Sequence, residues 1–349
     1  MTLDLDTFLV SIYYYVDLLF QRFFAAHRPP PHQRERMSDS YVITLFVISQ
    51  WSAHRAEARS LRYAQKYWLS YFTYILSQSA FNKRVRALSG VICYMVPLLE
   101  KELRTHLGLK SNYQVLDCVA VPVMERCRGD QSQLFVESAS IGKGGSGRKF
   151  YYGFKLLEAI NDVGLITGFV VGPANTEERF LAEAMLSWRI DPDWEAPSGE
   201  SINNLLGKRH STGNKEYRSG PTGPLSSCGV GYFSKVPYLT DLGFKGEKWE
   251  KHWREEYGAT LLNHSHMDKL PREIKKKRGR WLSRLRQDVE TGFYWQLSEL
   301  HLRSNKARSY GGWLARTGAK LLGYNLMVGL NLEKGKSKFE MSGYNALEM

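Results

Sequence analysis

The hydrophobic pattern of the chain changes near residue 113, and no other feature constrains the fold as strongly. From residue 1 to about residue 110, apolar residues recur at the three- and four-residue spacing of amphipathic helices. Residues 113–123, YQVLDCVAVPV, are instead a continuous β-prone run, which is typical of a strand buried on both faces. The sequence therefore predicts an all-helical region over 1–110, followed by an α/β domain.

The helical region contains a short basic segment, SAFNKRVR (79–86), between its third and fourth expected helices. The four helices are expected at 8–24, 42–51, 63–76 and 91–103. A polar break followed by a basic helix suits a helix-turn-helix, whose second helix lies in a DNA groove. A solvated basic helix face accounts for the same pattern equally well. The candidate DNA contacts here are Lys83, Arg84 and Arg86.

The region after residue 113 alternates strand patterns with helix patterns. The expected strands are 113–123, 150–160, 164–172, 236–244 and 259–264, and the expected helices are 175–186, 246–258 and a long helix that carries Glu290. The resulting order is three strands, a helix, a strand, a helix, a strand and a helix, and it predicts an α/β domain with five strands. Residues 187–226 lose this periodicity and predict a loop insertion, and residues 331–349 a loose C-terminal tail.

The formal net charge of +13 over 349 residues indicates an anionic partner, either nucleic acid or an acidic membrane surface. No apolar run reaches about 18 residues, and the N-terminus lacks the basic segment of a signal peptide, so neither a membrane span nor export is expected. The four cysteines show no C-x-x-C spacing, which favours a reducing, cytoplasmic location over a disulfide framework or a structural zinc site.

Three acidic residues stand out because of the segments in which they occur. Asp117 interrupts an apolar strand, Asp241 ends the fourth strand, and Glu290 follows a dense basic block. An unpaired buried carboxylate is costly, and the ends of neighbouring strands are where ligands collect in open α/β sheets. Three converging carboxylates predict Mg²⁺, with Mn²⁺ as a substitute, since these ions prefer oxygen ligands. For Glu290 alone, an ion pair with Arg286 four residues away is the simpler interpretation.

Positive charge is concentrated in two further places, and we expect these side chains to contact DNA phosphates. The candidates are Lys143, Lys149, Lys275, Lys276, Lys277, Arg278, Arg280, Arg284 and Arg286. A solvated charged face is the alternative for the 275–286 run, which contains no acid and has Glu273 just upstream. The glycine-rich segment 142–149 lacks the Walker spacing and runs into a strand, so no nucleotide cofactor is expected.

Three segments of the chain resemble motifs of the DDE transposases of bacterial insertion sequences, whose catalytic domain has the RNase H-like fold. VLDCVAVPV (115–123) resembles the first-aspartate strand, and LTDLGFKG (239–246) resembles the second-aspartate motif. Residues 286–326 resemble the C-terminal signature, with Arg286 and Glu290 as its R-x-x-x-E. Two departures are visible. Glu177 and Glu178 follow the Pro-Ala-Asn turn, where many relatives carry an aspartate, and we do not count them as catalytic. Leu297 stands where some relatives carry a lysine.

The resemblance implies a transposase with a helical DNA-binding region over 1–110 and an RNase H-like catalytic domain over 111–330. The RNase H-like fold implies a five-stranded mixed sheet flanked by helices. It implies that Asp117, Asp241 and Glu290 are the catalytic acids and hold Mg²⁺. The implied partners are double-stranded DNA, at transposon ends and targets, and a second copy of the chain on that DNA. Two alternatives stay open: a metal-dependent nuclease that cuts without joining, and a non-enzymatic DNA-binding protein derived from a transposase. A lipid-binding protein is a distant third, because no amphipathic basic helix stands out.

Overall fold

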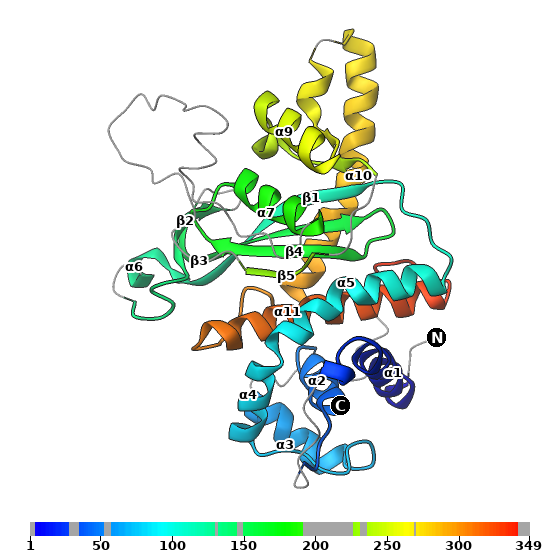
Figure 1. Cartoon of the computed structure of the whole chain (residues 1–349), viewed down its shortest axis with the longest axis vertical. Coiled ribbons are helices and arrows are strands. Elements are labelled where there is room, and N and C mark those ends of the chain that lie inside the picture. The colour runs from blue at the N-terminus through cyan, green and yellow to red at the C-terminus, as the bar shows by residue number, and fades with distance from the viewer. Residues whose placement is uncertain are drawn as a thin grey trace. The chain divides into compact units, whose positions relative to one another are not determined.

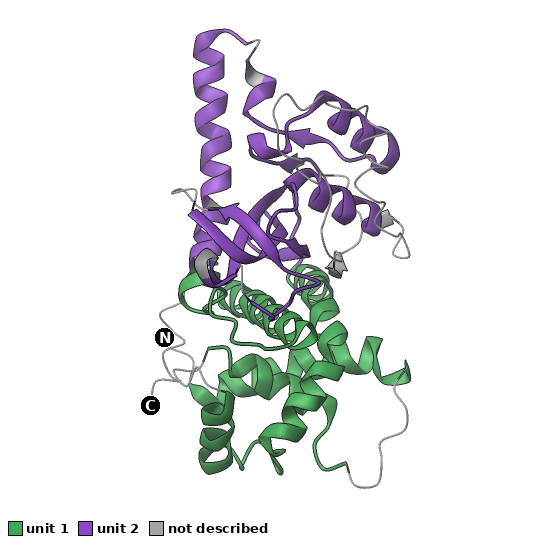
Figure 2. Ribbon diagram, turned by 90° about the vertical axis from the view of Figure 1, so that its left-hand side faces the viewer, with its two compact units in different colours: residues 1–107, 295–349 green, residues 108–294 purple. Residues whose placement is uncertain are grey.

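The computed structural model describes residues 4–27, 35–51, 57–129, 132–144, 149–190, 226–230, 236–268 and 270–340. The chain divides into two compact units, Met1–Leu107 with Trp295–Met349, and Gly108–Tyr294 (Figure 2). Most of the expected insertion at 187–226 and the end of the expected tail lie outside the described residues. None of the described helices combines the length and the apolar character needed to cross a membrane.

The first unit is helical (Figure 1). Its helices are α1 (Leu5–Phe23), η1 (Ala25–His27), α2 (Asp39–Ile48), α3 (Glu57–Tyr67), α4 (Gln78–Ala87), α5 (Ser89–His106) and α11 (Tyr310–Glu333). Asp4 accepts a hydrogen bond from the Thr7 backbone N–H and starts α1, while Ser38 accepts one from that of Tyr41 and starts α2. The predicted helical character of this region is therefore present.

Helix α11 belongs to the helical unit, whereas the sequence placed residues up to 330 in the α/β domain. From Thr317 to Asn331 every residue of α11 is buried, so the helix needs packing partners on all sides. Two glycines bring it close to α5. A Cβ on Gly318 would lie 2.6 Å from Cys93 Sγ, and one on Gly329 would lie 2.5 Å from Leu103 Cδ1. The structure therefore groups this segment with helices distant in sequence.

The connection between α3 and α4, residues 68–77, differs from the helix expected over 63–76. Trp68, Phe72 and Ile75 have the spacing of one helix face and are buried, but they lie outside the helices. The connection is also longer than the turn of about three to four residues in a helix-turn-helix motif. Burial of aromatic side chains from a non-helical segment explains why the pattern was misleading.

The second unit is built on one sheet with the strand order β5-β4-β3-β1-β6-β7, and β2 pairs with β3. The strands are β1 (Gln114–Glu125), β2 (Ser140–Gly144), β3 (Lys149–Asn161), β4 (Ile166–Pro173), β5 (Ser226–Val230), β6 (Tyr238–Leu239) and β7 (Leu261–Leu262). β3 is antiparallel to β1 and β4, whereas β6 is parallel to both β1 and β7. This confirms an α/β fold with a mixed sheet.

The described sheet has seven strands, so the expectation of five was wrong in number. The two additional strands, β2 and β5, have the sequences SIGKG and SSCGV. Each is five residues long and contains glycine, and neither shows the run of β-branched and aromatic residues that marks a strand. Pairing with a longer neighbour, β3 or β4, creates these strands, and sequence periodicity does not record such pairing.

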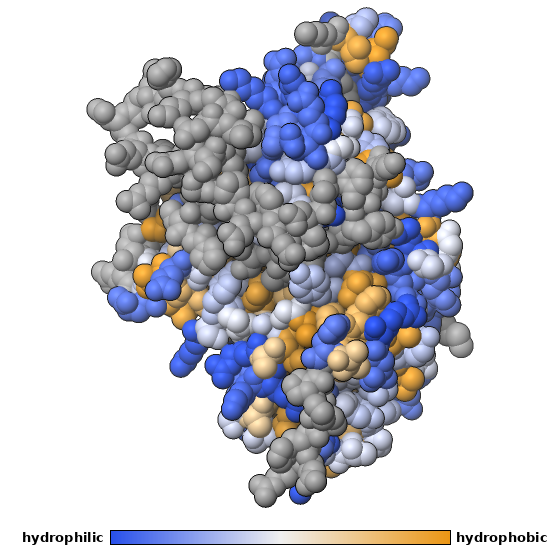
Figure 3. All heavy atoms as spheres, viewed as in Figure 1, coloured by the Kyte–Doolittle hydropathy of each residue, from blue (hydrophilic) through white to orange (hydrophobic). Residues whose placement is uncertain are grey.

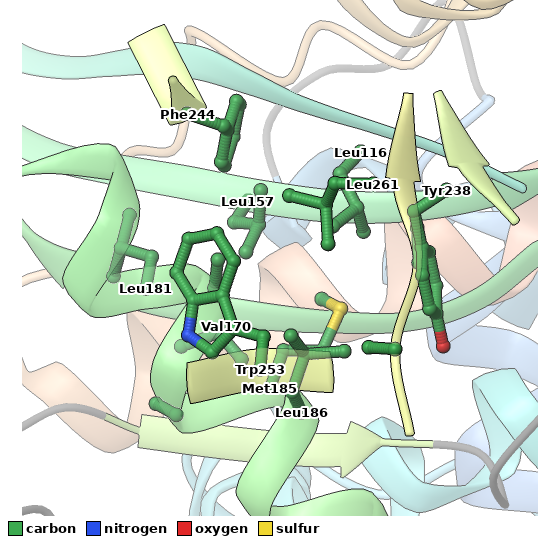
Figure 4. Packing of buried hydrophobic residues seen from close by; sticks show 14 of the residues in the cluster. Leu116, Leu157, Val170, Leu181, Met185, Leu186, Tyr238, Phe244, Trp253 and Leu261 are labelled. Atoms are coloured by element: carbon green, nitrogen blue, oxygen red, sulfur yellow. The ribbon is translucent and has the colours of Figure 1, made fainter. Parts of the chain in front are cut away.

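Helices accompany the sheet: α6 (Arg126–Gly129), α7 (Glu178–Ile190), η2 (Leu242–Phe244), α9 (Glu247–Tyr257), η3 (His264–Met267) and α10 (Arg272–Ser298). The core of this unit packs Leu116 and Leu157 of the sheet against Met185 of α7 and Trp253 of α9 (Figure 4). Since successive side chains of a strand point to opposite faces, the burial of Leu116 in this core turns Asp117 to the other face.

Candidate functional site

Asp117 lies within β1, and its side chain is 18% exposed. One carboxylate oxygen accepts a hydrogen bond from the Cys118 backbone N–H at 2.7 Å, and the other lies 3.2 Å from Arg286 Nη2 on α10. Burial raises the pKa of Asp117 above its usual value, the charge of Arg286 opposes this, and the charge of Asp241 adds to it. Asp117 is therefore a half-buried, ion-paired carboxylate with a second acid nearby.

Asp241 is brought beside Asp117 by the register of two parallel strands. Val115 of β1 pairs with Leu239 of β6, so each aspartate lies two residues beyond a paired position. The Asp241 carboxylate accepts a hydrogen bond from the Gly243 backbone N–H at 2.8 Å, which starts η2. The two aspartates singled out from the sequence thus converge at neighbouring parallel strands.

A third carboxylate joins this pair, and the sequence interpretation had set it aside. Glu178, in the first turn of α7, has a pKa raised by burial and then by the charges of Asp241 and Asp117, while Lys155 lowers it. A Cβ on Gly243 would lie 1.8 Å from Glu178 Oε2, so only glycine leaves room for this carboxylate. The one feature of the sequence that pointed to Glu178 is its position in the first turn of a helix. Acids are common there because they interact favourably with the helix dipole, so the position did not indicate a site.

Glu290 is the third acid that the resemblance implies. It is exposed on α10, one turn beyond Arg286. Arg286 donates to Asp117, while the simpler interpretation of the sequence paired it with Glu290. In the part of the chain that the structure describes, no group of three or more His, Cys, Asp and Glu side chains is placed to hold a metal ion. The charge of Asp241 acts on Asp117, and the charges of Asp241 and Asp117 act on Glu178.

A basic groove of about 680 Å³ begins directly after Asp241. Leu242 and Lys245 form one end, η3 contributes His264, and one face of α10 completes it. The cationic side chains that line it are Lys245, Lys275, Lys276, Arg280 and Arg284. Asp268 is the one acid in this lining, and it pairs with Lys275 at 2.8 Å. The face seen in Figure 3 is mostly hydrophilic around α9. A groove with this excess of positive charge suits a polyanion.

The other predicted DNA contacts fall into two groups. Six of them are exposed: Lys83 and Arg86 on α4, Lys143 on β2, Lys149 on β3, and Lys277 and Arg278 on α10. Arg84 differs, because its side chain forms ion pairs with Glu35 and Asp39 and is only 24% exposed. These neighbours occupy its guanidinium group, which argues against Arg84 as a phosphate contact. For the exposed lysines and arginines, contact with DNA stays a prediction.

The raised pKa values of Asp117 and Glu178 predict that stability falls as pH rises. A carboxyl group with a higher pKa in the folded state binds more protons when folded, so its charged form destabilises the fold above the unfolded-state pKa. Without divalent cations, Glu178→Gln is therefore expected to become increasingly stabilising, relative to wild type, as pH rises above about 4.5. Denaturant unfolding at several pH values measures this difference.

The matched control is Glu177→Gln, because Glu177 is the exposed neighbour of Glu178 and pairs with Arg179 at the surface. A surface ion pair contributes about 0–1 kcal/mol, so this variant should show little dependence on pH in that range. Equal pH profiles for the two variants would contradict the assignment of Glu178 to the carboxylate cluster.

No protein-family model matches the chain, and no curated protein or solved structure matches it either. The resemblance to DDE transposases therefore rests on the three motif segments. What the structure adds is the placement of their acidic residues and of the basic groove.

Proposed function

We propose that this protein is a DDE-type transposase that cleaves DNA and joins its strands. The observation that carries the proposal is the juxtaposition of Asp117 on β1 and Asp241 just after β6, the parallel neighbour of β1, beside the start of the basic groove. Two acids at such a position repel each other and favour a bound cation, while the groove favours a polyanion. Phosphodiester chemistry on nucleic acid needs both features at one place.

The proposal includes an RNase H-like fold for residues 111–294. Its support is the succession of elements: an antiparallel set β1, β3 and β4, then α7, β6, α9, β7 and α10. This is the succession that the motif resemblance implies. β2 and β5 are additions to it.

The metal proposed here is Mg²⁺, for which Mn²⁺ would substitute. The donor set fits these ions, because Asp117 and Asp241 offer only carboxylate oxygens, and the raised pKa of Asp117 includes the repulsion from Asp241 that a cation relieves. Glu290 is the third ligand in this proposal. When bound, such ions stabilise the attacking and leaving oxygens of a phosphodiester displacement.

The chain's own residues have distinct proposed roles. Arg286 holds the carboxylate of Asp117 and offsets its charge, and the Gly243 N–H orients that of Asp241. Arg280 and the other cations of the groove bind phosphates, which supplies affinity without sequence information. The partners proposed are transposon-end and target DNA, bound by a dimer, because joining involves two DNA ends.

A second candidate is a non-enzymatic DNA-binding protein derived from a transposase. The observation that favours it is the exposed position of Glu290, together with the lack of a three-residue metal-holding group among the described residues. A nuclease that cuts without joining is the third candidate, and the same assay separates all three.

The test is incubation of the protein with a plasmid that carries the DNA flanking its own gene, with Mg²⁺ or with EDTA. The transposase proposal expects Mg²⁺-dependent cuts at the element ends and joined products in a second plasmid. Cuts without joined products would support the nuclease. Specific binding of the flanks with no cutting at any Mg²⁺ or Mn²⁺ concentration would overturn the enzymatic proposal in favour of the DNA-binding protein.

A further inference from the structure

A second cavity, of about 100 Å³, lies within the helical unit and is lined by polar side chains. Glu57 at the start of α3, Asn305 and Lys306 before α11, and Arg316 and Lys320 on α11 form much of its wall. Pockets for drug-sized ligands have about 300–1,000 Å³, so this cavity suits a small polar group. None of these residues has a part in the proposed DNA chemistry.

The cavity has more positive charge than its own acid offsets. Lys320 is 5% exposed and donates a hydrogen bond to the Leu300 carbonyl, which is neutral. Glu57 is the carboxylate of the lining, and it pairs with Arg316 Nη2 at 2.5 Å. Lys306 is exposed at the cavity. A buried ammonium without a charge partner is costly, and a bound anion would remove that cost.

The protonation of Lys320 is sensitive to what occupies the cavity. Burial, followed by the charge of Arg316 one turn away, lowers the pKa of Lys320 to about 7. The other charged or titratable groups that line the cavity are Glu57, His301 and Lys306. Near neutral pH the amine is therefore only partly charged, and an anion beside it would favour the charged form.

The lining also contains an acceptor that needs a donor. Asn305 Nδ2 donates to the Trp313 carbonyl at 2.8 Å and to Thr317 Oγ1 at 3.0 Å, which fixes the orientation of the amide. Asn305 Oδ1 is buried and has no hydrogen-bond partner. A ligand that satisfies the polar groups of the whole cavity must accept hydrogen bonds from the cations and also donate a hydrogen bond to Asn305 Oδ1. Sulfate and phosphodiesters have no donor, whereas inorganic phosphate retains a hydroxyl at neutral pH, and a phosphate monoester has one in its singly charged form, which ionises with a pKa of about 6.

We propose that this cavity binds one protonated phosphate group, which accepts from Lys306, Arg316 and Lys320 and donates to Asn305 Oδ1. The group is either inorganic phosphate or the terminal phosphate of a monoester. The groups that would contact the phosphate lie on α11 and the segment before it, and none of them is assigned a role in the proposed DNA cleavage.

Calorimetric titration of the full chain with sodium phosphate, and with sodium sulfate at the same ionic strength, tests the proposal. At about pH 7, phosphate is expected to bind saturably with a Kd below about 1 mM, and sulfate at least about tenfold more weakly. Lys320→Met should weaken phosphate binding about 10- to 100-fold, since it removes a charged hydrogen-bond donor. Lys334→Met, at the exposed end of the same helix, should leave binding unchanged.

A second measurement separates binding from a purely structural role. NMR titration of the Lys320 side-chain amine should show its pKa rise from about 7 when phosphate is added, but not when sulfate is added. Lys320→Met is expected to fold, because an apolar side chain of similar length replaces a buried charge. Equal binding of phosphate and sulfate, or wild-type phosphate binding by Lys320→Met, would overturn the proposal.

Two oligonucleotides distinguish the sources of the phosphate group. If a terminally phosphorylated strand displaces inorganic phosphate and the same strand with a terminal hydroxyl does not, the site takes a nucleic-acid end. If neither strand competes while phosphate binds, the site takes the free ion. Failure of both inorganic phosphate and the phosphorylated strand to bind would refute the site in either form.

Discussion

Asp117→Asn and Asp241→Asn are each expected to lower Mg²⁺-dependent DNA cleavage by on the order of 1,000-fold or more. Asparagine keeps the size and one acceptor oxygen of aspartate but removes the negative charge that would hold a divalent cation. Since the two carboxylates already repel each other, the fold should tolerate either substitution. Single-turnover cleavage of flanking DNA, with binding measured separately, tests this expectation.

A matched pair of substitutions identifies the third acid. Glu290→Gln is expected to reduce cleavage as strongly as the aspartate variants, and Glu178→Gln much less. The structure makes this comparison informative, because the charges of both aspartates raise the pKa of Glu178, while Glu290 is exposed. The reverse result would assign Glu178 as the third ligand and leave Glu290 a surface residue. Unchanged cleavage in Asp117→Asn or Asp241→Asn would contradict the site itself.

The convergence of Asp117 and Asp241 was predictable, because both the strand pattern and the rule about strand ends are local features. An aspartate within an apolar strand is visible in the sequence, and so is an aspartate where a strand ends. The parallel pairing of β1 with β6 then follows from the order of strands and helices. The register that places the two acids side by side could not be predicted from the sequence, and the structure provides it.

Other features depend on contacts between segments far apart in the chain, and these were not predictable. Glu178 looks like an ordinary acid of a first helical turn until the turn at Gly243 is placed against it. Arg84 looks like a phosphate contact until Glu35 and Asp39 pair with it. The grouping of α11 with the helical unit likewise depends on its packing against α5.

Replacing three groove cations with neutral side chains should weaken DNA binding strongly. Lys276, Arg280 and Arg284 are spaced four residues apart on α10, and all three line the groove. The triple variant Lys276→Gln, Arg280→Gln, Arg284→Gln is expected to bind double-stranded DNA on the order of 100-fold more weakly at about 0.1 M salt. Each lost phosphate contact should also reduce the slope of log K against log salt concentration by about 0.9.

The control removes the same net charge from exposed positions outside the groove lining. Lys248, Lys251 and Arg254 lie on α9, and all three are exposed. Their triple glutamine variant should lose much less affinity and keep most of the salt slope, because a general attraction by net charge is screened beyond about 10 Å at 0.1 M salt. Equal losses in the two variants would show that net charge, and not the groove, binds DNA. Wild-type binding by both would exclude this part of α10 from the DNA interface, and the acidic cluster would then need another substrate.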